Sequence, residues 1–188
     1  MMVPEAPLER TEFGLAPAGG GWFVLSAREA RWRHRPGRGE SLPFTGWTDF
    51  ECETYFPQVG IGLIVLGPGE PNSMYHWETE TEAFLVLSGE ALLIVEGQER
   101  PLRPWDFVHC PAQTSHMIVG AGNGPCAVLA IGAREHIGAD CNGGAYTVDE
   151  VALRHGAGVE EETSDAELAY ARFPKTEPTR YRDGWLPG

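Results

Sequence analysis

Two histidines and a group of glutamates in this chain have the types and spacing of a metal-binding set. His76, Glu78 and Glu82 lie in one short segment, and His116 follows after two apolar runs. Imidazole nitrogens and carboxylate oxygens together suit a divalent transition metal. A set of three such ligands leaves coordination positions open for water, substrate or oxygen. These residues therefore predict metal-dependent chemistry.

The segment that carries His76 is predicted to be a strand. The apolar run at residues 60–66 reads as a strand that ends in the turn residues 67–72, and the chain then enters the segment around His76. Residues two apart in a strand face the same side. We therefore expect His76 and Glu78 to point together and Trp77 to point away.

Glu82 begins the next apolar run. Residues 83–87 and 91–95 are both strand-like, and the turn between them predicts a hairpin. Glu80 is expected in an exposed turn before this hairpin. An unpaired carboxylate buried in an apolar strand is costly. We therefore expect Glu82 to bind an ion, or otherwise to have a raised pKa or an exposed position.

His116 lies in a third unit of the same kind. A strand at residues 106–110 leads into a turn at 111–114, and a second strand leads out through residues 115–119. His109, in the first of these strands, is expected to be a core histidine that lines the interior of the barrel.

At these residues the chain resembles the cupin superfamily, in its conserved-barrel type. The first motif of that family is a glycine, two histidines separated by one residue, a glutamate and a second glycine. The corresponding residues here are Gly69, His76, Glu78, Glu82 and Gly89. The gap from Gly69 to His76 is longer than the pattern by one residue, and Glu78 replaces the second histidine.

The second cupin motif is also present in modified form. It is a glycine, then proline, any residue and glycine, followed by a histidine and an asparagine. The corresponding residues are Trp105, Pro111, Gln113, His116 and Gly120. Two motifs in order, separated by apolar strands, indicate the fold more strongly than either alone. The resemblance covers roughly residues 60–132.

The resemblance implies a ligand set and a range of chemistry. Cupins bind a metal through two or three histidines and one glutamate, which implies His76, Glu82 and His116 here, with Glu78 as a further ligand, a nearby base or an exposed replacement. The metal would be iron, manganese, nickel or zinc. Two histidines and one carboxylate with open positions are typical of non-haem iron oxygenases. The resemblance also implies a homodimer.

The predicted fold is all-β: a small antiparallel β-barrel, or jelly roll, with short helices in the C-terminal tail. Turn residues recur regularly between residues 60 and 132, as in a sandwich or barrel. We expect one domain over residues 1–188. Its core would span about 45–134, with an N-terminal arm at 1–44 and a helical tail at 135–188.

Local patterns outside the core predict further elements. Residues 22–25 read as a short strand, residues 26–29 as a helical turn, and the basic run at 31–38 as a solvated loop. A strand is expected within 48–56, and the proline in 99–103 indicates an edge strand. Capping-box patterns predict helices at residues 147–153 and 164–172.

The composition argues against several classes of partner. With 14 Lys and Arg against 27 Asp and Glu, the net charge is −13, which repels nucleic acid and anionic membranes. No apolar run approaches the roughly 18 residues of a membrane span. We expect a cytoplasmic protein with a small-molecule partner. Its four cysteines, Cys52, Cys110, Cys126 and Cys141, have no CxxC spacing and are expected to be buried thiols.

Three functions remain open from the sequence. The first is a metal-dependent enzyme, oxygenase-like, that acts on a small organic molecule. The second is a non-catalytic cupin that binds or senses a small ligand or a metal. The third is a metal-free isomerase in which His76 and Glu82 act as an acid–base pair.

Overall fold

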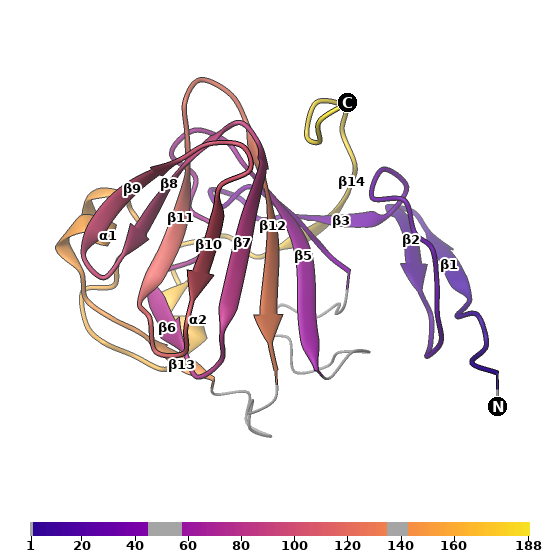
Figure 1. The fold of residues 1–188 in the computed structure, drawn as a ribbon, viewed down its shortest axis with the longest axis horizontal. Helices are drawn as coiled ribbons and strands as arrows, with labels where there is room; N and C mark the ends of the chain where they lie inside the picture. Colours follow the sequence, from indigo (N-terminus) through magenta and orange to yellow (C-terminus); the bar gives the residue numbers. More distant parts are fainter. Residues whose placement is uncertain (1, 45–57, 135–142) are drawn as a thin grey trace.

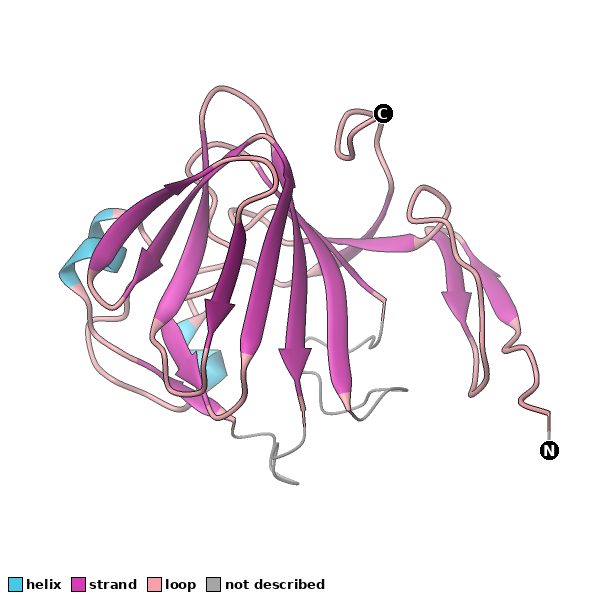
Figure 2. Ribbon diagram, viewed as in Figure 1, coloured by secondary structure: helices cyan, strands magenta, loops and turns pink. Residues whose placement is uncertain are grey.

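The chain is built mainly from antiparallel strands (Figures 1 and 2). The computed structural model describes residues 2–44, 58–134 and 143–188. Its strands are β1 Leu8–Thr11, β2 Gly14–Pro17, β3 Arg31–His34, β4 Glu40–Pro43, β5 Val59–Leu66, β6 His76–Glu78, β7 Glu82–Ser88, β8 Glu90–Val95, β9 Gln98–Leu102, β10 Phe107–Cys110, β11 His116–Ala121, β12 Cys126–Ala133, β13 Gly144–Tyr146 and β14 Glu177–Arg180. Two short helices, α1 Glu150–Arg154 and α2 Ala166–Ala169, lie in the tail.

Two larger sheets form the body of the molecule. One has seven strands in the order β10-β7-β12-β5-β4-β3-β14, and the other has five in the order β13-β6-β11-β8-β9. The predicted all-β class with helices in the tail is confirmed. Within the described residues the two larger sheets are separate rather than one sheet closed into a barrel, and β1 and β2 form a two-stranded sheet of their own.

The main core lies between the two sheets. Phe84 and Val86 of β7 are buried against Leu93 of β8 and Ile118 of β11. Alternate residues of each strand face this space, as expected when two sheets pack face to face. The same inward positions carry the polar residues of the candidate site.

The predicted hairpin at residues 83–95 is wrong. Its two strands form as β7 and β8, but β7 belongs to the seven-stranded sheet and β8 to the five-stranded sheet. Gly89 between them has φ +74°, and a Cβ there would collide with the carbonyl oxygen of Pro125. Alternation and turn residues predict where strands begin and end, but they do not specify which strands pair.

The N-terminal arm differs from the prediction at two places. The basic run forms β3 and a turn instead of a solvated loop, because Trp32 within it is fully buried. The strand expected at residues 22–25 is reduced to a single bridge between Trp22 and Glu5. A turn forms at 26–29 as expected, with the Ser26 carbonyl oxygen accepting from backbone N–H groups. The strand expected within 48–56 lies outside the described residues.

Both tail helices form, although each differs from its prediction. Asp149 caps α1 by accepting from the N–H of Ala152 at 2.8 Å, where the pattern had indicated a cap at residue 147. Asp165 caps α2, which ends at Ala169, earlier than expected. An aspartate carboxylate at the helix start accepts from the free N–H groups of the first turn. None of the described helices is long and apolar enough to cross a membrane.

Candidate metal centre

Strands from both sheets bring the predicted ligands together. His76 and Glu78 lie on β6, and His116 lies on β11, where it is the direct cross-strand partner of His76. Glu82 begins β7 in the opposite sheet. The four side chains therefore meet across the space between the sheets.

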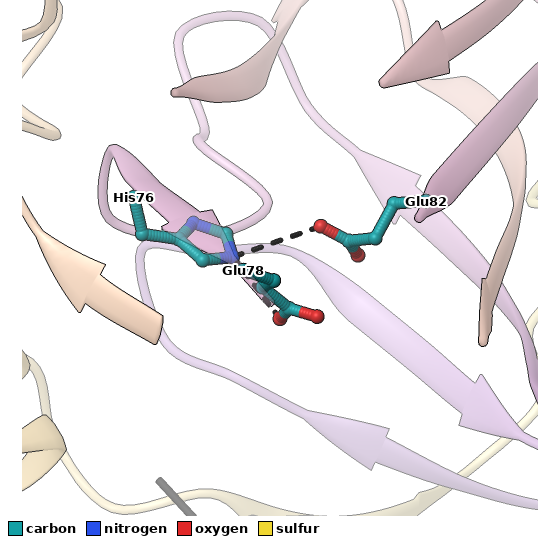
Figure 3. Close-up of side chains that lie close together, drawn as sticks. All are labelled: His76, Glu78 and Glu82. Atoms are coloured by element: carbon teal, nitrogen blue, oxygen red, sulfur yellow. Dashed lines mark hydrogen bonds and ion pairs between the residues drawn. The ribbon is translucent and has the colours of Figure 1, made fainter. Parts of the chain in front are cut away.

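The distances between the donor atoms are short. His76 Nε2 lies 3.3 Å from Glu78 Oε1 and 3.9 Å from Glu82 Oε2 (Figure 3). His116 Nε2 lies 3.0 Å from Glu82 Oε2. His76, Glu78 and Glu82 can each present a ligand atom within 4.8 Å of the other two. Glu82 is thus the residue that joins the two histidines.

These spacings fit donors that share one ion. Metal bonds of about 2.1 Å at right angles put neighbouring donor atoms about 3.0 Å apart, and tetrahedral angles put them about 3.4 Å apart. The contacts of 3.0 and 3.3 Å match that range, whereas the 3.9 Å from His76 Nε2 to Glu82 Oε2 lies above it. His116 is not among the three residues whose ligand atoms all lie within 4.8 Å of one another, so its imidazole would have to move for all four to share one ion. Moreover, Glu82 Oε2 and His116 Nε2 are buried and have no partner with hydrogen-bond geometry among the described residues. Two buried donor atoms that face each other without a hydrogen bond are suited to a shared cation.

Both histidines are held in the orientation that a metal ligand needs. The Nδ1 of His76 lies 2.8 Å from the carbonyl oxygen of Met74, and the Nδ1 of His116 lies 2.9 Å from that of Thr114. A carbonyl oxygen only accepts, so each Nδ1 carries the proton that it donates. In the neutral ring, Nε2 then keeps its lone pair, which faces Glu82 in His116 and both Glu78 and Glu82 in His76. This backbone support fixes tautomer and ring direction, as in known metal sites.

Exposure increases from one side of the site to the other. The side chain of His116 is 2% exposed and that of Glu82 is 17% exposed. His76 is 14% exposed, and Glu78 is 34% exposed. A small molecule would therefore reach the centre from the Glu78 side, whereas His116 forms its closed end.

The surroundings of the histidines favour a positive charge. Burial lowers the pKa of His116, but contacts with Cys110 and Glu82 outweigh burial and raise that pKa to about 11. Burial likewise lowers the pKa of His76, whereas Glu78 and Glu82 raise it, and the net shift is upward. A cation at the centre would take the place of these protons.

The expectation of a raised pKa for Glu82 without an ion is wrong. Burial does raise the pKa of this carboxyl, but contacts with His116 and His76 outweigh burial, and the net shift is downward. The two imidazoles supply the compensating charge that the sequence argument had assigned to a metal alone.

At two positions of the second motif this chain has another residue in place of glycine. Both residues keep the backbone conformation that glycine favours. Trp105 has φ +74° and Gln113 has φ +67°, in the left-handed region that favours glycine. The N–H of Gln113 donates to the carbonyl oxygen of Glu78 at 2.7 Å, which ties this turn to β6. The loop that orients His116 therefore keeps its shape despite the substitutions.

Gly120 stands where the motif has asparagine, and the local packing explains it. A Cβ at Gly120 would collide with the carbonyl oxygen of Gly67. The N–H of Gly69 donates to the carbonyl oxygen of Gly120 at 2.8 Å, and that of Gly120 donates to the carbonyl oxygen of Glu70 at 2.9 Å. This close approach of two backbones leaves no room for a side chain.

Sequence reasoning missed Tyr146. It lies on β13 as the cross-strand partner of His76, and the two ring centroids are 5.8 Å apart. Burial, the neighbouring Tyr170 and Glu78 raise the pKa of its phenol, so the phenol keeps its proton. Tyr146 lies beyond the stretch that resembles a cupin, and no local pattern relates it to His76.

Two other residues are placed differently from their predictions. Glu80 is 6% exposed, so the expectation of an exposed turn residue is wrong. His109 is exposed on the outer face of β10, because Val108 and Cys110 take the inward positions, so the core-histidine prediction is also wrong. Neither residue belongs to the group of donors.

Comparison with solved structures finds distant similarities. A provisionally assigned sugar phosphate isomerase from Acidithiobacillus ferrooxidans is 28% identical over 58% of this chain and 65% of its own length, with TM-score 0.44. A cupin 2 conserved-barrel protein from Salinispora arenicola is 23% identical over 49% of this chain and 72% of its own, with TM-score 0.41. A sugar phosphate isomerase of the cupin superfamily from Silicibacter pomeroyi is 22% identical over 70% and 72%, with TM-score 0.43.

The family comparison is more specific about where the similarity lies. No curated protein matches the chain significantly. The model of the cupin domain family matches residues 62–132, from β5 to β12. This range contains His76, Glu78, Glu82 and His116, together with both altered motifs. Over residues 62–132, which are 71 of its 188 residues, the chain matches the cupin domain family.

Proposed function

We propose that this protein is a metal-dependent cupin enzyme that acts on a small organic molecule. His76, Glu82 and His116 would hold a divalent transition metal, with Glu78 at its open side. The observation that carries the proposal is that both histidines are held in the same way, each by its own backbone carbonyl. Each Nδ1 is bonded to a backbone carbonyl, which leaves His116 Nε2 facing Glu82 at 3.0 Å and His76 Nε2 facing Glu78 at 3.3 Å and Glu82 at 3.9 Å.

The donor set limits which metals are suitable. Two imidazoles with one or two carboxylates suit iron and manganese better than copper, and nickel and zinc are also compatible. The bound ion would supply Lewis acidity and open positions for substrate or oxygen. An oxygen-dependent reaction is our leading assignment, because two histidines and one carboxylate are typical of non-haem iron oxygenases.

The protein's own residues would divide the remaining tasks. His116 and Glu82 form the buried end, where solvent has little access. Glu78 lies at the accessible side, 3.3 Å from His76 Nε2, and can accept a proton from a bound molecule. Its carboxylate would also favour substrates that carry a hydroxyl or another hydrogen-bond donor.

Oxygen uptake tests this assignment. The protein would be loaded with iron or with manganese and assayed against a panel of small phenols, hydroxy acids and thiols. We expect oxygen consumption in proportion to added substrate, and its loss in Glu82→Gln. If the loaded protein consumes no oxygen with any compound while its metal stays bound, the oxygenase assignment is wrong.

Proton transfer is a second candidate, which Tyr146 and Glu78 favour. A neutral phenol and an accessible carboxylate both lie beside His76, so the site offers an acid and a base to one molecule. An isomerase or lyase would use such a pair. Exchange of substrate protons in deuterated water, followed by NMR, tests it. Tyr146→Phe should abolish the exchange without changing metal content.

A non-catalytic binding role would explain the site better if both activity tests are negative. If the protein holds its metal but neither consumes oxygen nor exchanges substrate protons, the site would serve to bind or sense a small ligand. The replacement of a family histidine by Glu78 is compatible with that role.

A further inference from the structure

Two arginines at the turn between β3 and β4 form no ion pair with a carboxylate of the described residues. The backbone N–H of Arg38 donates to the carbonyl oxygen of Arg35 at 2.7 Å, which closes this turn. The guanidinium of Arg35 donates through Nη1 to the carbonyl oxygen of Asn72 at 2.9 Å and through Nη2 to that of Arg38 at 2.8 Å. Its Nε is buried and has no hydrogen-bond partner. Buried charges are normally paired, so this pair of arginines lacks a counter-ion.

The carboxylates nearest in effect to Arg35 hold other groups. Burial and the charge of Arg38 lower the pKa of Arg35 to about 10, and Glu40 and Glu70 only partly oppose that shift. Glu40 Oε1 lies 2.9 Å from a histidine nitrogen, and its Oε2 is buried without a hydrogen-bond partner. Glu70 Oε2 accepts from a backbone N–H at 2.8 Å. The positive charge of the two arginines is therefore only partly compensated, which is costly for a buried group.

Aromatic rings, rather than hydrogen bonds, hold the guanidinium of Arg38. Its Cζ lies 4.4 Å from the ring centroid of Tyr170 and 5.3 Å from that of Phe173. Its Nε is buried without a partner, and its side chain donates no hydrogen bond within the described part of the chain. The two terminal nitrogens are not among the buried unpaired atoms, so they reach solvent. A stacked guanidinium of this kind presents a planar fork of donors that matches a carboxylate or a phosphate.

Arg172 provides the contrast on the same ring. Its Cζ lies 5.1 Å from the centroid of Phe173, but its Nη2 donates to the carbonyl oxygen of Gly156 and lies 3.2 Å from Met74 Sδ. Those contacts join α2 and the residues after it to the end of α1 and to the segment before β6. The donors of Arg172 thus serve the fold, whereas those of Arg38 hold no part of the protein.

The ring beneath Arg38 is fixed in place. The backbone N–H of Met74 donates to the hydroxyl oxygen of Tyr170 at 3.1 Å. Tyr170 meets Tyr146 edge to face with centroids 5.5 Å apart, and Tyr146 lies 5.8 Å from His76. Two aromatic rings therefore lie between Arg38 and the nearest candidate metal ligand. An anion at Arg38 would occupy a place of its own and would not replace a metal donor.

We propose that Arg38, supported by the charge of Arg35, binds the carboxylate or phosphate group of a small molecule. The anion would accept hydrogen bonds from the terminal nitrogens of Arg38, and its charge would offset that of the buried Arg35. The chain has a net charge of −13, which repels anions at long range, so binding depends on this local pair of arginines. The site stands on its own and needs no metal.

Calorimetric titration of the full chain with inorganic phosphate, and separately with succinate, tests the proposal. The protein would first be treated with a chelator, and chloride would keep the ionic strength constant. We expect the wild type to bind at least one of the two anions, which identifies the preferred acidic group. Arg38→Gln should weaken that binding by about tenfold or more, because charge-assisted hydrogen bonds are lost. Arg38→Lys should also weaken it, since an ammonium group lacks the planar fork.

Arg154→Gln is the matched control, because it removes the same charge from a side chain that is 62% exposed elsewhere. We expect its affinity for the anion to equal that of the wild type. Arg38→Lys keeps the charge, so it decides the question even if Arg38→Gln does not fold.

Three outcomes would overturn the proposal. The wild type binds neither anion, or both Arg38 variants bind as tightly as the wild type. In the third, binding appears only after a metal is restored and is absent in His116→Ala, which would place the anion on the metal. Failure of the metal centre itself leaves the expected result with the chelated protein unchanged, so the two proposals are tested separately.

Discussion

At the scale of single residues, anchoring distinguishes the two site histidines from the other histidines that pair with glutamate. His34 lies 2.9 Å from Glu40, and His155 lies 2.8 Å from Glu99, so contact with a carboxylate is not unusual here. His76 and His116 differ because a backbone carbonyl also holds the second ring nitrogen. An imidazole with one nitrogen fixed in this way presents the other as a ligand.

Metal affinity should rise with pH. Neighbouring acidic groups outweigh burial and raise the pKa of His116 to about 11 and that of His76 above its usual value of 6.5. Both rings therefore hold a proton more tightly in the metal-free protein than a free imidazole does, and the ion must displace these protons. We expect affinity to increase by up to about tenfold per pH unit for each displaced proton between pH 6 and 8.

Calorimetric titration with zinc in buffers of different ionisation enthalpy measures this release. The apparent binding enthalpy should change with the buffer in proportion to the number of protons released. His109→Ala is a suitable control, because that ring is exposed and lies outside the donor group. An affinity that does not change with pH, and an enthalpy that does not change with the buffer, would contradict the assignment of the histidines as ligands.

At the scale of elements, two turns carry backbone strain near the site. Gln113 precedes β11 and Trp105 precedes β10, and both adopt a left-handed backbone. This conformation costs a residue with a Cβ roughly 1–2 kcal/mol. The strained residues lie at two positions where the cupin motif has glycine.

Replacing Gln113 by glycine should therefore stabilise the protein. We expect Gln113→Gly to raise the free energy of unfolding by about 1 kcal/mol, because the strain is removed and the N–H that bonds to Glu78 remains. Gln98→Gly in β9 is the matched control, and it should lower stability since glycine is unfavourable inside a strand. Urea denaturation measures both. Equal destabilisation in the two variants would show that the turn is unstrained.

The sequence predicted the positions of the strands better than it predicted which strands pair. Apolar runs between turn residues located β7, β8, β10 and β11, because alternation and turn chemistry act within a few residues. Pairing depends on contacts between distant segments, so the predicted hairpin failed where the chain crosses between sheets at Gly89.

The candidate site was predictable only in part for the same reason. His76, Glu82 and His116 share a spacing that the family resemblance made recognisable, and the structure places them together. Tyr146 lies beside His76 through cross-strand register. Register is a property of the folded sheet, and nothing in the local sequence around Tyr146 indicates it.

At the scale of the whole molecule, the N-terminal hairpin of β1 and β2 is set apart from the two large sheets. The β1–β2 pair stands beside the two large sheets as a separate two-stranded sheet (Figure 1). Such a sheet is marginally stable by itself. Trp22 and Val24, which follow it, are 52% and 81% exposed. An apolar surface of this kind suits contact with a second copy of the chain.

We therefore expect a homodimer that depends on the arm. Light scattering after gel filtration should give twice the chain mass of 20.6 kDa. The double variant Trp22→Ser, Val24→Ser should shift the mass toward the monomer. The control Trp105→Ser, at a residue that is 73% exposed elsewhere, should not shift it. A monomer at all concentrations would refute the dimer, and an unaffected dimer in the double variant would place its interface elsewhere.

The central claim is that His76, Glu82 and His116 hold a metal ion. Its most direct test is elemental analysis of untagged protein, purified without chelators, beside His116→Ala and the exposed-histidine control His109→Ala. We predict close to one iron, manganese, nickel or zinc per chain in the wild type and in His109→Ala, and its loss in His116→Ala. Trace metal in all three proteins, with no uptake when metal is supplied, would contradict the account and favour a metal-free ligand-binding or acid–base role.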